Sequence, residues 1–120
     1  MKIAIPVNDM REEAEVCVSF GRAPYFLIYD TNSKEVVFSR NKAAEAQGGA
    51  GIKSAQAIVD EKAKVLLTVR CGQNAAEVFN AAEVKVYKTT KVTAKENIEA
   101  FEKGELALMT QFHAGFHGKA

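Results

Sequence analysis

The sequence has almost no surplus charge: sixteen lysines and arginines oppose fifteen aspartates and glutamates, which leaves a formal net charge of +1. Proteins that bind nucleic acids usually carry a basic excess or a basic stripe, so we expect no nucleic-acid partner. The chain also lacks any apolar run long enough to cross a bilayer. Its start, MKIAIPVN, has no signal-peptide pattern. We therefore expect a cytoplasmic protein without a membrane partner.

Cysteine and histidine, which often carry metal and nucleophilic chemistry, are scarce. The two cysteines, Cys17 and Cys71, should remain thiols in a reducing compartment. Both histidines, His113 and His117, fall in the last eight residues, so a Ser-His or Cys-His couple would have no well-placed base. Gly-x-Ser-x-Gly and His-Glu-x-x-His motifs are absent as well. We expect a protein that is not an enzyme.

The spacing of apolar residues predicts five strands and three helices in the order β-β-β-α-β-α-β-α. The strands are expected at 3–7, 25–30, 35–39, 65–69 and 84–87, and the helices at 52–62, 74–82 and 93–103. The polar turn 31–34 favours an antiparallel hairpin between the second and third strands. Asn74 with Glu77, and Thr93 with Glu96, resemble capping boxes that would open the last two helices.

Right-handed strand–helix–strand crossovers require the later strands to run parallel to the first. The sequence therefore predicts an α/β domain with three layers, α/β/α, and ribonuclease-H-like topology. Its five-stranded mixed sheet has the order 3-2-1-4-5, with only strand 2 antiparallel. Residues 1–110 form this single domain, and residues 111–120 are expected to be a flexible tail that contains both histidines.

The predicted topology brings the loops that leave strands 1, 3, 4 and 5 to one edge of the sheet. The strand order reverses between strands 1 and 4, which is where open α/β sheets form a ligand crevice. We expect the ligand site there. Its candidate residues come from the loops that border this point: Cys17, Ser19, Arg22, Gly49, Gly51, Arg70 and Cys71.

Soft donors are the candidates for metal chemistry. Cys71 lies between a strand end and a helix N-terminus, a position that lowers a thiol pKa. It is either a cluster ligand or reactive thiol, or a half-buried turn residue. Cys17 is a second soft donor or an ordinary buried residue. His113 and His117 are spaced i, i+4 and could share a metal on a helix, although neighbouring glycines favour a solvated tail.

Glycine and arginine supply the candidates for anion binding. The run Gly48-Gly49-Ala50-Gly51 could let backbone amides approach an anion, or it is a flexible connector. It matches neither a Walker loop nor a dinucleotide fingerprint. Arg22 and Arg70 either bind an anionic ligand or form solvated charges and salt bridges.

One stretch has the character of a family signature. Ser19 to Phe26 (SFGRAPYF) resembles the entry to the hairpin in the dinitrogenase iron–molybdenum cofactor family, and the resemblance continues through 65–76, 84–87 and 93–101. It implies the ribonuclease-H-like fold and a role in handling an iron–sulfur or iron–molybdenum cluster. The chain departs from the family at Ser19 and at 47–51, where many members have histidine. A serine hydroxyl is a poor substitute for the imidazole and thiolate ligands of iron.

Two functions remain open. The first is a non-catalytic carrier or accessory protein for a metallocluster, with Cys71 as its strongest ligand and a cluster-biosynthesis protein as its partner. The second is a small-ligand or protein-interaction module that no longer binds metal, with a small anion as the expected ligand. A third, weaker alternative is a thiol-dependent enzyme that uses Cys71. A nuclease is not expected, because only Asp9 reaches the crevice while Asp30 and residues 60–61 point away from it.

Overall fold

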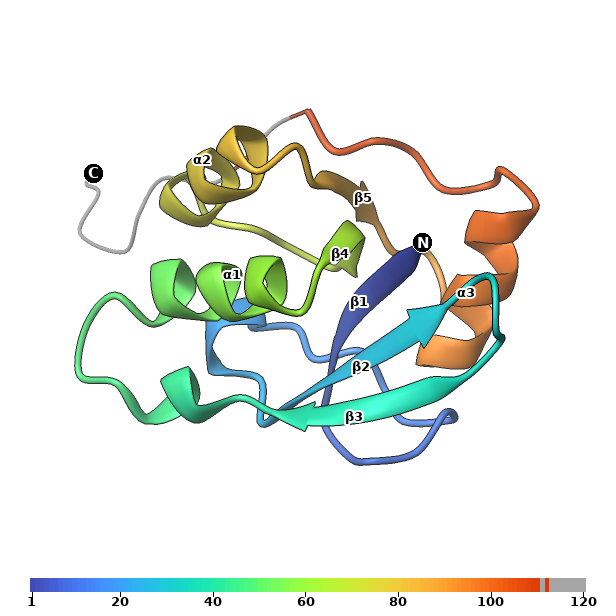
Figure 1. Cartoon of the computed structure of the whole chain (residues 1–120), viewed down its shortest axis with the longest axis horizontal. Helices are drawn as coiled ribbons and strands as arrows, with labels where there is room; N and C mark the ends of the chain where they lie inside the picture. Colours follow the sequence, from blue (N-terminus) through green and yellow to red (C-terminus); the bar gives the residue numbers. More distant parts are fainter. Residues whose placement is uncertain (111, 113–120) are drawn as a thin grey trace.

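The computed structural model describes residues 1–110 and residue 112. Its five strands form one sheet in the order β3-β2-β1-β4-β5 (Figure 1). They are β1 (Lys2–Val7), β2 (Tyr25–Asp30), β3 (Val36–Arg40), β4 (Ala63–Thr68) and β5 (Lys85–Lys88). Strand β2 is antiparallel to β1 and β3, and β1, β4 and β5 are parallel. The predicted strand order and directions are confirmed.

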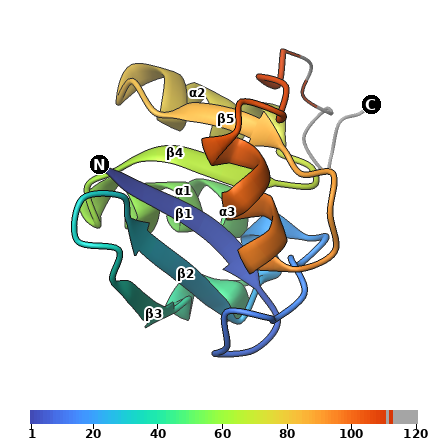
Figure 2. The ribbon, with the colours of Figure 1, turned by 90° about the vertical axis from the view of Figure 1, so that its right-hand side faces the viewer.

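The three helices cover both faces of the sheet. Helices α1 (Ala50–Asp60) and α2 (Gln73–Ala81) lie on one face, and α3 (Ala94–Glu102) lies on the other (Figures 1 and 2). Successive side chains of a strand point to opposite faces, so β1 contributes Ala4 to the α1/α2 side and Ile3 and Ile5 to the α3 side. The predicted three layers are thus confirmed, each helical layer with its own apolar core.

Two predicted capping boxes had different outcomes. Thr93 Oγ1 accepts a hydrogen bond from the Glu96 amide at 3.2 Å, and the Glu96 carboxylate accepts from the Thr93 amide at 3.2 Å, which confirms the box that opens α3. The box at Asn74 is wrong, because the N-cap residue of α2 is Gly72, two residues earlier, and the helix begins at Gln73. The Gly72 carbonyl already accepts from the Ala76 amide at 3.0 Å, which places Asn74 inside the first turn.

The segment after α3 adds a short pairing to the outer side of β5. The Lys88 amide donates to the Ala107 carbonyl at 3.0 Å, and the Met109 amide donates to the Val86 carbonyl at 2.8 Å. Tyr87 and Leu108 form an antiparallel bridge between these bonds. We call residues 105–110 the C-terminal segment. It passes over the sheet edge from α3 toward α2 (Figure 1).

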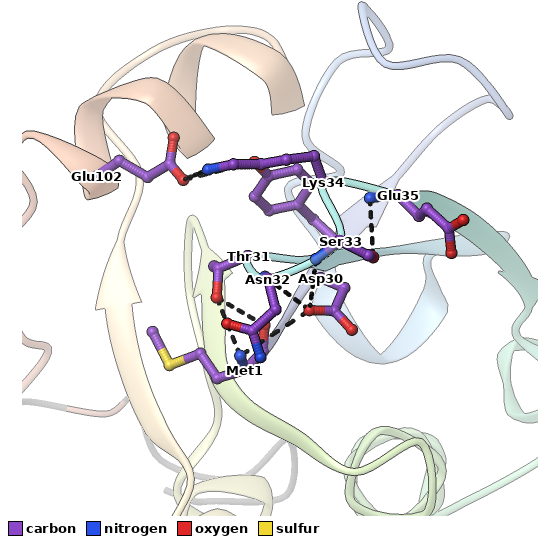
Figure 3. Close-up of polar contacts among 9 residues, drawn as sticks. Met1, Asp30, Thr31, Asn32, Ser33, Lys34, Glu35 and Glu102 are labelled. Carbon is purple, nitrogen blue, oxygen red and sulfur yellow. Dashed lines mark hydrogen bonds and ion pairs between the residues drawn. The ribbon is translucent and has the colours of Figure 1, made fainter.

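Hydrogen bonds join the hairpin turn between β2 and β3 to the start of β1 (Figure 3). Asp30 Oδ1 accepts from the Asn32 amide at 2.8 Å, and Lys34 adopts a left-handed backbone conformation with φ 66°. The Met1 amino group donates to Thr31 Oγ1 at 2.9 Å. Because Met1 precedes β1, this turn lies at the amino edge of the parallel strands, and the carboxyl edge is left for the candidate site.

Among the described residues, no helix has both the length and the apolar character that a membrane span requires.

Candidate ligand-binding site

The carboxyl edge of β4 and β5 carries a hollow of about 380 Å³, which we call the β4–β5 hollow. The loop that leaves β4, the last residue of β5 and the C-terminal segment surround it. Its lining consists of Val69, Arg70, Cys71, Lys88, Ala107, Leu108, Met109 and Thr110. It therefore lies one strand away from the crevice predicted between the first and fourth strands, and it includes two of the residues predicted there, Arg70 and Cys71.

Two cationic side chains line the β4–β5 hollow. Lys88 Nζ lies 3.4 Å from the Val69 carbonyl oxygen, to which it donates a hydrogen bond. Within the described part of the chain, neither Arg70 nor Lys88 forms an ion pair, and no carboxylate lines the hollow. Two uncompensated positive charges at a concave surface attract an anion and raise its local concentration.

Cys71 lies at the inner wall of the hollow and is almost fully buried, with 2% of its surface exposed. It packs in the same apolar cluster as Ala75 and Phe79 of α2. Burial raises its pKa to about 11, so the pKa lowering expected from the helix N-terminus is wrong. The cause is desolvation, which disfavours the charged thiolate. At neutral pH the free thiol is protonated, which argues against a thiol-dependent reaction.

Cys17 is half-buried and packs against the apolar cluster that contains Cys71. Its thiol donates to the Ser19 carbonyl at 3.4 Å, and its amide donates to the Pro6 carbonyl at 2.8 Å. Across residues 1–110 and 112, no group of three or more His, Cys, Asp or Glu side chains is arranged to hold one metal ion. The predicted donors His113 and His117 lie outside the described residues.

Arg22 belongs to the short 3-10 helix η1 (Phe20–Arg22), which follows the exposed Ser19. Its Nη1 donates to the carbonyls of Ala44 at 2.7 Å and Ala46 at 2.6 Å, at the end of the second 3-10 helix η2 (Lys42–Glu45). This side chain therefore holds η2 against η1. It is not part of the β4–β5 hollow, and the same holds for Ser19.

The predicted glycines serve the start of α1. Gly49 is the N-cap residue of α1 and has φ 69°, a conformation that glycine adopts at little cost. A Cβ on Gly21 would lie 3.0 Å from both the N and Cα atoms of Gly51. Gly21 thus lets η1 pack directly on the first turn of α1. Gly51 takes part in this packing, Gly49 caps the helix, and neither lines the β4–β5 hollow.

A buried polar network joins η1, α1 and the residue that caps η2. Asn41 Nδ2 donates to the Ala23 carbonyl at 2.9 Å and to Ser54 Oγ at 3.0 Å, and Ser54 Oγ lies 3.1 Å from the Gly21 carbonyl. Both side chains are buried, and all their bonds are formed inside the protein. Satisfied networks of this kind fix one arrangement of the surrounding backbone. The stretch 19–26, which we call the signature loop, is consequently held in one arrangement against η2 and α1.

The sequence did not identify Lys88 and Met109 as site residues. For Lys88 the sequence gives a partial signal, because the loop that leaves the fifth strand is expected at this edge of the sheet. Met109 belongs to the C-terminal segment, for which no element was predicted. Its only signal is the short apolar stretch Leu106-Ala107-Leu108-Met109, which is compatible with a strand.

Comparison with known proteins supports the same fold. The orange protein of Desulfovibrio gigas, solved in its apo form, is 27% identical over 90% of this chain and 92% of that chain, with a TM-score of 0.86. A NifB-like protein from Thermotoga is 39% identical, with a TM-score of 0.81 and coverage of 92% and 95%. A dinitrogenase-like protein from Methanocaldococcus jannaschii, 22% identical with coverage of 92% and 96%, shares the fold with a TM-score of 0.68. No curated protein matches the chain.

The family assignment comes from the sequence match. The family model described as dinitrogenase iron-molybdenum cofactor matches residues 1–104. This range contains the signature loop, all five strands and the three helices, so the match confirms the predicted resemblance. The chain belongs to the dinitrogenase iron-molybdenum cofactor family.

Proposed function

We propose that this protein is a non-catalytic carrier or accessory protein that holds an anionic metallocluster, of the iron–sulfur or iron–molybdenum type, in the β4–β5 hollow. The observation that carries the proposal is the pair of cations, Arg70 and Lys88, beside the buried thiol of Cys71. Family membership supports a role associated with such a cofactor. The apo form of the orange protein is consistent with a relative that exists with and without a bound group.

The donor set determines how a cluster would be held. One buried thiol cannot complete the four-coordinate shell that iron takes in cysteine-ligated clusters. The described residues offer no set of three donors. A cluster that keeps its own sulfide ligands and a net negative charge fits the hollow better, since Arg70 and Lys88 would bind it through charge-assisted hydrogen bonds. Cys71 would ligate it only after losing a proton from a thiol whose pKa is about 11.

A second function is favoured by the same lack of a three-donor group among the described residues. In this alternative the hollow binds a small metal-free anion, or the protein acts as an interaction module. For either function we infer a cytosolic location, which the two free thiols, Cys17 and Cys71, support. A protein of cluster biosynthesis is the partner we infer for the carrier.

The experiment is anaerobic reconstitution with iron and sulfide, with and without molybdate, followed by metal analysis and an absorption spectrum. The test variant is Arg70→Gln/Lys88→Gln. The matched control is Lys64→Gln/Lys85→Gln, which removes two exposed charges from the same strands, β4 and β5, away from the hollow. We expect metal to be retained by the wild type and the control, and to be lost from the test variant.

The variant Cys71→Ala distinguishes a cluster that is held by the two cations from one that is ligated by the cysteine. Metal retained in Cys71→Ala but lost in Arg70→Gln/Lys88→Gln shows that the cluster is held by charge. Metal lost only in Cys71→Ala identifies the cysteine as the ligand. Metal absent from the wild type rejects the carrier proposal and favours the metal-free alternative.

A further inference from the structure

A second hollow, of about 400 Å³, lies between η2 and α1. We call it the η2–α1 hollow. Residues at the end of β3, in η2 and on one side of α1 form its lining, which consists of Arg40, Asn41, Lys42, Ala43, Ala46, Lys53 and Ala57. The two hollows have different linings, so a ligand of the η2–α1 hollow is independent of the function proposed above.

The η2–α1 hollow concentrates positive charge. Three cations line it, namely Arg40, Lys42 and Lys53, although the whole chain has a net charge of only +1. Within residues 1–110 and 112, none of the three forms an ion pair, and no acidic side chain lines the hollow. Three like charges around one hollow, with no counter-charge in its lining, repel one another, and an anion bound there reduces that repulsion.

Two carboxylates near the end of α1 have hydrogen-bond partners of their own. Glu61, at the end of α1, accepts a hydrogen bond from Ser39 Oγ at 3.1 Å, and Asp60 accepts from Gln56 Nε2 at 3.1 Å. Glu45 belongs to η2 but does not line the hollow. The positive charge of the lining is therefore presented to solvent.

The backbone around the hollow is fixed in advance. Asn41, which is 4% exposed, accepts from the Ala43 amide at 3.2 Å and thereby caps η2. At the other end of η2, Arg22 Nη1 donates to the carbonyl of the C-cap residue Ala46 at 2.6 Å. Ser54 ties Asn41 to α1 through a hydrogen bond of 3.0 Å. Because hydrogen bonds hold the backbone of η2 at both ends, it loses little conformational entropy when a ligand binds, and this favours affinity.

We propose that the η2–α1 hollow binds a small multivalent oxyanion, either a phosphate ester or a polycarboxylate. The guanidinium of Arg40 matches the paired oxygens of such a group, while Lys42 and Lys53 add point charges around it. The methyl groups of three alanines, Ala43, Ala46 and Ala57, form the rest of the lining and leave room beside the cations. The volume of about 400 Å³ lies within the range of small-molecule sites.

The test is a titration of the ¹⁵N-labelled full chain, followed by amide chemical shifts at constant ionic strength. The probes are inorganic pyrophosphate and citrate, with acetate as the monovalent control. We expect saturable shifts in residues 40–46 and 53–57 with at least one multivalent probe. Arg40→Gln and Lys53→Gln should each raise the Kd by about five-fold, as expected for one charge removed at close range in water.

The matched variants decide where the anion binds. Lys64→Gln/Lys85→Gln should leave the Kd unchanged, and so should Arg70→Gln/Lys88→Gln, because neither pair lines the η2–α1 hollow. Saturation with pyrophosphate alone identifies phosphate esters as the ligand class, and saturation with citrate alone identifies polycarboxylates. Uniform shifts at all lysines, a failure to saturate with both probes, or a Kd that changes only in Arg70→Gln/Lys88→Gln overturns the proposal.

Discussion

Replacing Asn97 with alanine should remove a buried polar hub of the loop between β5 and α3. Asn97 is 0% exposed. Its Oδ1 accepts from the amides of Thr90 and Lys91, both at 3.1 Å, and its Nδ2 donates to the carbonyls of Lys91 at 3.0 Å and Thr93 at 2.7 Å. Asn97→Ala leaves these four backbone groups without their side-chain partner.

The magnitude follows from the solvent access of those groups. Each intramolecular hydrogen bond contributes about 1 kcal/mol net, so the loss of four sets an upper bound of about 4 kcal/mol. The Thr93 carbonyl keeps a bond from the Asn97 amide at 3.2 Å, and Thr90 and Lys91 are exposed, so water replaces part of the loss. We expect the free energy of unfolding to fall by about 2–3 kcal/mol.

Urea denaturation measures this change as a shift of the midpoint at constant slope. The matched control is Asn80→Ala, which makes the same replacement at an exposed position of the helix α2. The control also corrects for the higher helix propensity of alanine. If Asn97→Ala and Asn80→Ala differ by less than about 0.5 kcal/mol, the side chain is not the hub that its contacts indicate.

Three further predictions concern the signature loop, the thiols and the end of the chain. Gly21→Ala should lower the free energy of unfolding, measured by urea denaturation, by about 1–3 kcal/mol, because its Cβ would meet backbone atoms at 3.0 Å. Gly48→Ala, where a Cβ would meet nothing, should lower it far less, and equal effects would contradict the close packing. In native protein at pH 8, iodoacetamide should modify Cys17 well before Cys71, because burial raises the pKa of Cys71 to about 11 and covers its sulfur. Mass spectrometry of timed samples measures the two rates, and equal rates would refute this expectation. Deletion of residues 111–120 should reduce iron content after reconstitution without abolishing it, and unchanged iron would show that the two histidines add no ligand.

The fold could be predicted from local patterns because they agree with one another. Buried strands gave continuous apolar runs, and the polar turn 31–34 left only an antiparallel partner for β2. The crossovers through α1 and α2 then required β4 and β5 to be parallel to β1. Each step uses residues that are close in sequence, or a handedness rule that holds for nearly all proteins.

The site could not be predicted to the same degree, because it depends on contacts between distant segments. The wall of the β4–β5 hollow forms when residues 107–109 pair with β5, about twenty positions earlier in the chain. Arg22 has its partners in carbonyls of η2 and not in a ligand, a choice that charge alone does not reveal. For Cys71, the sequence position suggests a lowered pKa, whereas burial, which the sequence does not reveal, raises it.

The pairing of the C-terminal segment with β5 also protects the sheet against self-association. An edge strand offers unpaired N–H and C=O groups to other chains and can start aggregation. Residues 107–109 occupy such groups of Val86 and Lys88. At the other edge β3 carries Val37, which is 59% exposed, so we expect any intermolecular strand addition on that side. A chain cut before Glu105 would also expose the Lys88 amide and the Val86 carbonyl of β5. One truncation would then remove a wall of the β4–β5 hollow and leave a second unpaired strand edge on the sheet.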